Sequence, residues 1–175
     1  MMKKVRFALA FALVSLCTLA HAQSAQSEAE KSFERLKTLA GTWEGVVTTD
    51  PKTPAIDGKI MQVTLRVTSM GNTLMHEMTT PSRPDDPITM LYLDEGRLQL
   101  MHFCDAGNRP RMTGKLTPDG KAVEFDFLDV TGNMKYGHMH RATFSFVDAT
   151  HHTEDWTFMA GERSVRAHVD LKRKP

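Results

Sequence analysis

The sequence predicts an all-β protein: a roughly ten-stranded antiparallel up-and-down barrel preceded by a short N-terminal helix. From Gly41 to the C-terminus, apolar and polar residues alternate with a period of two, which is typical of half-buried strands. Turn signals that contain glycine separate these runs, and no second helical pattern interrupts them. Many short strands joined by tight turns favour an antiparallel meander, and closing such a sheet removes its exposed edges.

The first 22 residues have the composition of a signal peptide. Met1 to Arg6 is basic, Phe7 to Ala20 is apolar but too short to span a bilayer, and Ala20-His21-Ala22 has the small residues of a signal-peptidase site. We therefore expect cleavage near Ala22, a periplasmic or secreted protein, and no membrane span in the mature chain.

The remaining residues suit one domain, with a polar lead-in and helix over 23–40 and the barrel over 41–175. Leaving out Lys3, Lys4 and Arg6 changes the formal net charge from +1 to −2. This balance argues against nucleic acid as a partner. Cys104 is the only cysteine outside the expected leader, so we expect a buried, inert thiol, with a reactive thiol as the alternative. The composition leaves the oligomeric state open.

The helix and strands can be placed in chain order. Phe33, Leu36 and Leu39 recur at helical spacing, which predicts a short amphipathic helix over 28–39. The alternating runs predict strands over 43–49, 60–70, 73–80, 87–93, 97–104, 110–117, 121–128, 138–147, 151–160 and 163–172.

Hairpin turns determine which side chains share a face of the barrel. A two-residue turn at Gly71-Asn72 would place Val67 opposite His76 and point His76 inward. A three-residue loop at Asp94-Glu95-Gly96 would place Tyr92 opposite Leu98, on the inner face.

The same reasoning applies to the later hairpins. A three-residue loop at Asp148-Ala149-Thr150 would place Phe144 opposite Glu154, and His140 opposite Phe158. Across all strands the inner face is then unusually polar, with these inward residues: His76, Tyr92, His102, His138, His140, His152 and Glu154. A slip of one residue in any hairpin would reverse the faces of one strand.

We expect this interior to hold a small, partly apolar ligand without catalysis, because ligand cavities combine apolar walls with a few polar groups. Arg111 would add a contact to a carboxylate or phosphate at the barrel mouth, or else lie exposed on the rim. The predicted ligand-binding residues are His76, Tyr92, His102, Arg111, His140, Glu154 and Trp156. The alternative is a structural role, in which the buried polar groups bond to each other or to trapped water.

A metal- or haem-binding barrel is the second hypothesis. His138 and His140 lie two residues apart on one strand, a spacing that suits zinc or copper, and Glu154 would be a third ligand. A third hypothesis is an enzyme in which His140 and Glu154 transfer a proton. No catalytic-triad order, phosphate loop or dinucleotide fingerprint is present, so we favour a protein that is not an enzyme. The sequence does not identify a cofactor.

The entry Gly41-Thr42-Trp43, directly after the helix, resembles the start of calycin-type barrels, which include lipocalins, fatty-acid-binding proteins and the nitrobindin-like group. Four segments also resemble a family of exported bacterial proteins of unassigned function: 33–37, 102–112, 137–140 and 154–158. The resemblance implies a calycin-like barrel with a cavity, but it implies no particular activity. Nitrobindin-like barrels hold haem through a histidine near the C-terminus, whereas His168 is expected to face outward here.

Overall fold

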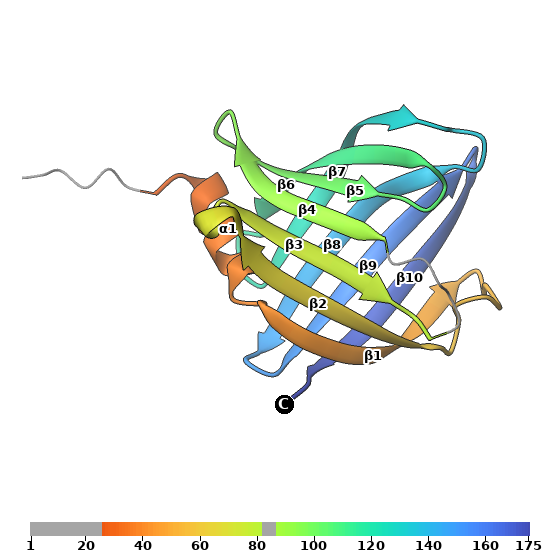
Figure 1. Cartoon of the computed structure of the whole chain (residues 1–175), viewed down its shortest axis with the longest axis horizontal. Helices are drawn as coiled ribbons and strands as arrows, with labels where there is room; N and C mark the ends of the chain where they lie inside the picture. The colour runs from red at the N-terminus through yellow and green to blue at the C-terminus, as the bar shows by residue number, and fades with distance from the viewer. Residues whose placement is uncertain (1–25, 82–86) are drawn as a thin grey trace, which may run out of the picture.

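The protein is a closed ten-stranded antiparallel barrel with one short helix, as seen in a computed structural model that describes residues 26–81 and 87–175 (Figure 1). The expected signal peptide, 1–22, lies outside the described residues. The elements are α1 (Glu28–Lys37), β1 (Gly41–Asp50), β2 (Ile60–Thr68), a single 3-10 turn η1 (Ser69–Gly71), β3 (Thr73–Thr79), β4 (Ile88–Asp94), β5 (Arg97–Phe103), β6 (Asn108–Leu116), β7 (Ala122–Gly132), β8 (His138–Asp148), β9 (His151–Ala160) and β10 (Arg163–Arg173). Each strand pairs with the next along the chain, and β10 pairs with β1 to close the barrel.

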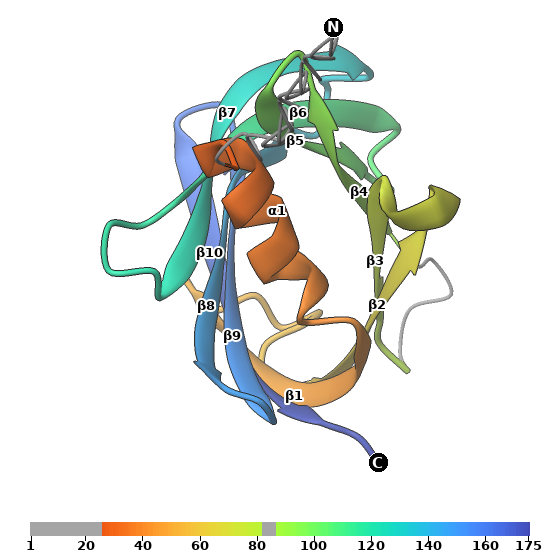
Figure 2. The same cartoon turned by 90° about the vertical axis from the view of Figure 1, so that its left-hand side faces the viewer.

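Helix α1 covers one end of the barrel, where it packs against β4, β5 and β6 (Figure 2). It begins at a capping box, in which the Ser27 hydroxyl accepts from the Glu30 amide and the Glu30 carboxylate accepts from the Ser27 amide. Phe33 and Leu36 are buried against the barrel. The Ser32 hydroxyl accepts a hydrogen bond from the Leu116 amide at 3.1 Å, which joins α1 to the end of β6. In the described part of the chain, no helix is long and apolar enough to cross a membrane.

Trp43 joins the end of the helix to the barrel wall. The Trp43 side chain is fully buried, and its Nε1 donates to the Leu39 carbonyl at 2.8 Å. The Arg173 guanidinium, from the last strand, lies 4.1 Å from the centre of the Trp43 ring. The Gly-x-Trp entry therefore closes this end of the barrel against α1.

Two of the turns in the first half of the barrel differ from the sequence-based expectation. Between β2 and β3 the turn is longer than expected, so that His76 lies opposite Leu65 rather than Val67. This is a shift of two residues, and His76 stays on the inner face. Between β4 and β5 the three-residue loop is wrong: Asp94 pairs with Arg97 across the two-residue turn Glu95-Gly96.

Because the β4–β5 turn is one residue shorter than expected, the side chains of β4 point to the opposite faces from those expected. Tyr92 lies opposite Gln99 instead of Leu98, and Thr89 lies opposite His102. Thr89 and Leu91 are fully buried and occupy the inner face. Because side chains alternate along a strand, Tyr92 belongs to the outer face.

A β-bulge in β8 produces a third difference. The register with β9 shifts between Met139 and Arg141, so that Met139 lies opposite Phe158 at the position expected for His140. Nearer the β8–β9 turn the expected pairing of Phe144 with Glu154 is confirmed. The expected three-residue loop is wrong, because Asp148 pairs with His151 and a second bulge lies between Phe146 and Asp148.

Candidate functional site

A cavity of about 380 Å³ lies at the end of the barrel away from α1. Residues of the β1–β2 connection and of β2, β3, β5, β8, β9 and β10 line it. Figure 1 shows how these elements are arranged in the barrel. Most of its wall is apolar: Ile56, Met61, Met78, Pro87, Met139, Trp156, Phe158, Val165, Ala167 and Val169. Its polar lining residues are Thr53, Thr80, His102, Cys104 and Asp105. A mostly apolar wall with a few polar groups is the usual composition of a small-molecule site.

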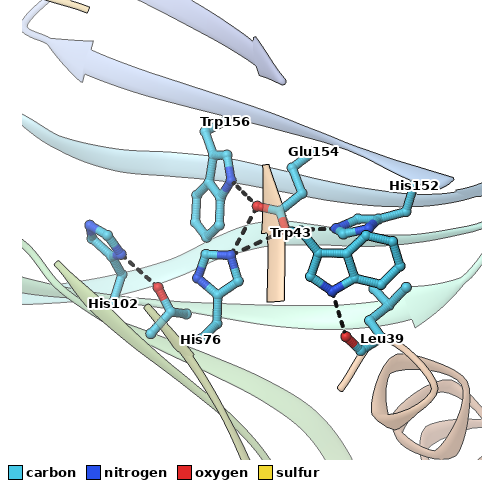
Figure 3. A network of polar contacts seen from close by, with 8 residues as sticks. Leu39, Trp43, His76, His102, His152, Glu154 and Trp156 are labelled. Atoms are coloured by element: carbon cyan, nitrogen blue, oxygen red, sulfur yellow. Dashed lines mark hydrogen bonds and ion pairs between the residues drawn. The ribbon is translucent and has the colours of Figure 1, made fainter. Parts of the chain in front are cut away.

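His102 and Trp156 connect this cavity to the centre of the barrel. Both line the cavity, and their ring centres are 5.6 Å apart. On the far side of the indole, Trp156 Nε1 donates to Glu154 Oε2 at 3.0 Å (Figure 3). The Trp156 indole therefore faces the cavity and also contacts a buried carboxylate.

The Glu154 carboxylate is the centre of a fully buried hydrogen-bond network (Figure 3). His76 Nε2 lies 2.9 Å from Oε2 and 3.2 Å from Oε1, and His152 Nε2 lies 3.1 Å from Oε1. Together with Trp156, three side chains direct nitrogen atoms at one carboxylate. The network brings together β3 and β9, strands far apart in the sequence.

The environment of Glu154 favours its ionised form. Burial raises the pKa of the Glu154 carboxyl, but the charge of His76 and the hydrogen bonds from His152 and His76 outweigh burial. The pKa of Glu154 is therefore lowered from its ordinary value. An ionised carboxylate only accepts hydrogen bonds, so both imidazoles must donate from Nε2.

The outer nitrogens of these two imidazoles have no hydrogen-bond partner among the described residues. His76 Nδ1 and His152 Nδ1 are both buried and unpaired. Each imidazole also contacts an aromatic ring: the ring centres of Phe144 and His76 are 5.7 Å apart, and those of Trp43 and His152 are 4.2 Å apart. Both imidazoles are thus held by hydrogen bonds to Glu154 and by aromatic contacts.

His102 has a different environment, because its hydrogen-bond partner is a neutral hydroxyl. His102 Nδ1 lies 2.8 Å from Thr89 Oγ1. Burial, with a smaller contribution from the charge of His76, lowers the pKa of His102 to about 3. The His102 imidazole is therefore neutral at physiological pH.

Four of the seven predicted ligand-binding residues meet in or below the cavity: His76, His102, Glu154 and Trp156. Tyr92, Arg111 and His140 do not join them. Tyr92 is on the outer face, and Arg111 forms a bidentate ion pair with Asp129, with Nε 2.8 Å from Oδ1. The rim alternative for Arg111 thus agrees with the structure better than a contact inside the cavity.

His138 and His140 lie beside Phe127, at ring-centre distances of 4.7 and 4.8 Å. The hydrogen-bond partners of Glu154 are other residues, so the predicted metal set of His138, His140 and Glu154 is not assembled. Over the described ranges, no group of three or more His, Cys, Asp or Glu side chains is arranged to hold a metal ion. The expected proton-transfer pair of His140 and Glu154 is likewise replaced by His76 and His152 at Glu154.

Thr89 and Thr80 are among the site residues that the sequence reasoning missed. Thr89 supports His102, and it was missed because the expected β4–β5 loop was one residue too long. Thr80 lines the cavity. The alternation of His76, Met78 and Thr80 along the predicted strand 73–80 was the signal that could have revealed it. His168 faces outward as expected and pairs with Asp155 at 3.0 Å.

No model of a known protein family matches the chain, and no curated protein matches it either. Solved structures do match. Rv2717c from M. tuberculosis is 16% identical with a TM-score of 0.60, over 82% of this chain and 98% of that one. A protein of unknown function from the DUF3598 family of Nostoc punctiforme is also 16% identical, with a TM-score of 0.56, over 79% of this chain and 49% of that one. At such identities the likeness extends to the barrel fold alone, and membership of the calycins stays a prediction.

Proposed function

We propose that this barrel binds a small, partly apolar molecule in its cavity and does not act on it chemically. The observation that carries the proposal is the cavity of about 380 Å³, with its largely apolar wall and few polar groups. Ligand sites commonly enclose roughly 300–1,000 Å³, so a ligand toward the smaller end of that range fits best. The signal-peptide-like composition of residues 1–22 supports action in the periplasm or outside the cell.

The residues divide into two roles under this proposal. His102 and Trp156 line the cavity and would contact the ligand directly. Glu154 and His76 lie beneath them and would hold the Trp156 indole in place. All described partners of the Glu154 oxygens are protein donors and the side chain is fully buried, which argues against a role as a catalytic base.

The first test is to purify the protein from its native host under mild conditions and to record its native mass spectrum. We expect a mass above that of the polypeptide, which falls to the bare mass after extraction with organic solvent. Bare polypeptide from the native host, together with no binding by the extracted protein, would contradict the proposal. Elemental analysis of the same sample tests the metal or haem alternative, which requires stoichiometric iron, copper or zinc.

The second test uses the two tryptophans of the chain, which lie in different parts of the barrel. Trp156 lines the cavity, whereas Trp43 is buried near the end that α1 covers. In a Trp43→Phe variant, adding the extracted molecule should change the fluorescence of Trp156. The matched Trp156→Phe variant, which keeps only Trp43, should respond much less.

A blocking variant connects binding to the cavity itself. Ala167→Phe places a large ring in the cavity wall and should abolish binding. Val46→Phe adds a ring on the exposed outer face of the barrel and should leave binding unchanged. Equal affinity in both variants would place the ligand elsewhere.

A further inference from the structure

We propose that His102 is a hydrogen-bond donor in the cavity and gives its Nε2 proton to an acceptor oxygen of the ligand, such as that of a carbonyl group. This inference rests on the proposed function and adds the chemical group by which the ligand is held. Three features of the described residues carry it: the partner of His102 Nδ1, the free Nε2, and the unpaired hydroxyl of Thr80.

The first feature is the hydrogen bond between Thr89 and His102, which lie opposite each other on β4 and β5. Thr89 Oγ1 lies 2.8 Å from His102 Nδ1, and both side chains are buried. Thr89 Oγ1 makes no other hydrogen bond with a described residue, so Nδ1 is the acceptor available to its proton. If Nδ1 donated instead, the Thr89 hydroxyl proton would be buried without an acceptor, which costs free energy.

The direction of this hydrogen bond determines where His102 carries its proton. Burial, with a smaller contribution from the charge of His76, lowers the pKa of His102 to about 3, so the ring is neutral at physiological pH. A neutral imidazole has one proton, on either Nδ1 or Nε2. Because Nδ1 accepts from the Thr89 hydroxyl, the proton is on Nε2, and His102 is a donor at that nitrogen.

The second feature is the place of this donor. His102 belongs to the cavity lining, and its Nε2 has no hydrogen-bond partner among the described residues. Figure 3 shows this nitrogen on the side of the ring that faces away from Glu154. His76 Nδ1 and His152 Nδ1 are also unpaired, but neither residue belongs to the described lining of the cavity. The free nitrogen of His102 is therefore the one that a ligand in the cavity can reach.

The third feature is a second unused donor in the wall. Thr80 lines the cavity, and its Oγ1 is buried with no hydrogen-bond partner among the described residues. Since a hydroxyl can donate, the wall has two unused polar protons, on His102 Nε2 and on Thr80 Oγ1. A carbonyl oxygen accepts from either group and has no proton of its own that needs an acceptor, while the rest of the molecule contacts the apolar wall.

The first test compares two probes of the same shape, decan-2-one and 2-methyldec-1-ene, which differ only in the acceptor oxygen. Both are titrated by Trp156 fluorescence in the Trp43→Phe variant, with and without the paired changes His102→Leu and Thr89→Val. The paired changes replace both partners of the hydrogen bond, so no buried hydroxyl loses its partner. We expect them to weaken the ketone relative to the alkene by about fivefold or more, because one hydrogen bond is lost. The alkene controls for altered packing.

The second test measures the tautomer directly, by nitrogen NMR of protein labelled at histidine. The signals of His102 are assigned by their loss in His102→Leu, and we expect a protonated Nε2 and an unprotonated, hydrogen-bonded Nδ1. In Thr89→Val the Nδ1 resonance should move to that of an unpaired imidazole nitrogen, because its donor is lost. Thr89→Ser is the matched control, since it keeps the hydroxyl, and should keep the wild-type resonance. Adding decan-2-one should shift the Nε2 proton more than 2-methyldec-1-ene does.

The outcomes separate this inference from the proposed function. A ratio of affinities that the paired changes leave unaltered, a proton on Nδ1, or an Nδ1 resonance that stays in place in Thr89→Val overturns the donor role of His102 but leaves the binding function in place. If neither probe binds, the molecule extracted from the native protein replaces them, and an affinity unaffected by the paired changes again overturns the donor role alone. A failure of every molecule to bind removes the proposed function and this inference together.

Discussion

Replacing Glu154 should destabilise the barrel more than any comparable change at its surface. Glu154→Leu would leave three buried donor groups without their acceptor: Trp156 Nε1, His76 Nε2 and His152 Nε2. An unsatisfied buried donor costs about 1–3 kcal/mol, and the imidazoles can recover part of that by changing tautomer, so we expect a total loss of about 3–5 kcal/mol. This is a large part of the roughly 5–15 kcal/mol by which such domains are stable.

Urea unfolding followed by far-ultraviolet circular dichroism would measure this loss as a lower transition midpoint at an unchanged slope. Glu154→Gln keeps the volume but removes the charge and turns an amide donor toward other donors, so we expect a smaller loss of about 1–3 kcal/mol. Glu162→Gln, in the exposed β9–β10 turn, is the control and should change the free energy of unfolding by less than about 0.5 kcal/mol.

A double-mutant cycle then separates the network from simple packing. Because His76 donates to Glu154, the loss in a His76→Leu, Glu154→Leu double variant should be smaller than the sum of the two single losses. A Glu154→Leu protein that unfolds at the wild-type urea concentration would refute the reasoning. It would show that apolar packing replaces the buried carboxylate without cost, as happens when some buried ion pairs are replaced as a unit.

Three further predictions concern single residues. The pKa of His102 in the folded protein is about 3, below its ordinary value of about 6.5. As the pH falls, the unfolded chain therefore takes up a proton first, and the free energy of unfolding decreases between about pH 6.5 and pH 3. In urea titrations, His102→Gln should reduce this loss by up to roughly 4–5 kcal/mol. Arg111→Gln removes a half-exposed ion pair with Asp129, so we expect the free energy of unfolding to fall by at most about 1 kcal/mol and the ligand affinity to stay unchanged. A large fall in affinity would show that Arg111 belongs to the binding site. Gly114→Ala would place a methyl group against the ring of Phe125 in the tightly packed interior. Thermal unfolding should then show a free energy of unfolding lower by about 1–3 kcal/mol. An unchanged unfolding temperature would contradict this packing.

The fold could be predicted from the sequence because alternation and turn signals act locally. Errors in turn length had unequal consequences. The β2–β3 turn was wrong by two residues and His76 still pointed inward, because side chains alternate with a period of two. The β4–β5 turn was wrong by one residue, which moved Tyr92 to the outer face and concealed Thr89.

The site was predictable only in part, because its geometry depends on contacts across the barrel. Parity indicated that His76 and Glu154 point inward, but nothing in the sequence shows that β3 and β9 bring them within hydrogen-bond distance. The bulge near His140 had no signal in the sequence, and it gave Met139 the cavity position. For most strands the sequence therefore shows which side chains point into the barrel, but it does not show which side chains they contact across it.

The pairing of β1 with β10 makes closure of the barrel depend on the last of its ten strands. Trp43 lies opposite Arg173, and the register continues to Asp50 opposite Arg166, so strands from the two ends of the domain form one ladder. During folding, one edge of β1 stays open until the 11 residues of β10 pair with it. A chain that ends before Arg163 would leave one edge of β1 and one edge of β9 unpaired, and these two open edges would favour aggregation over folding.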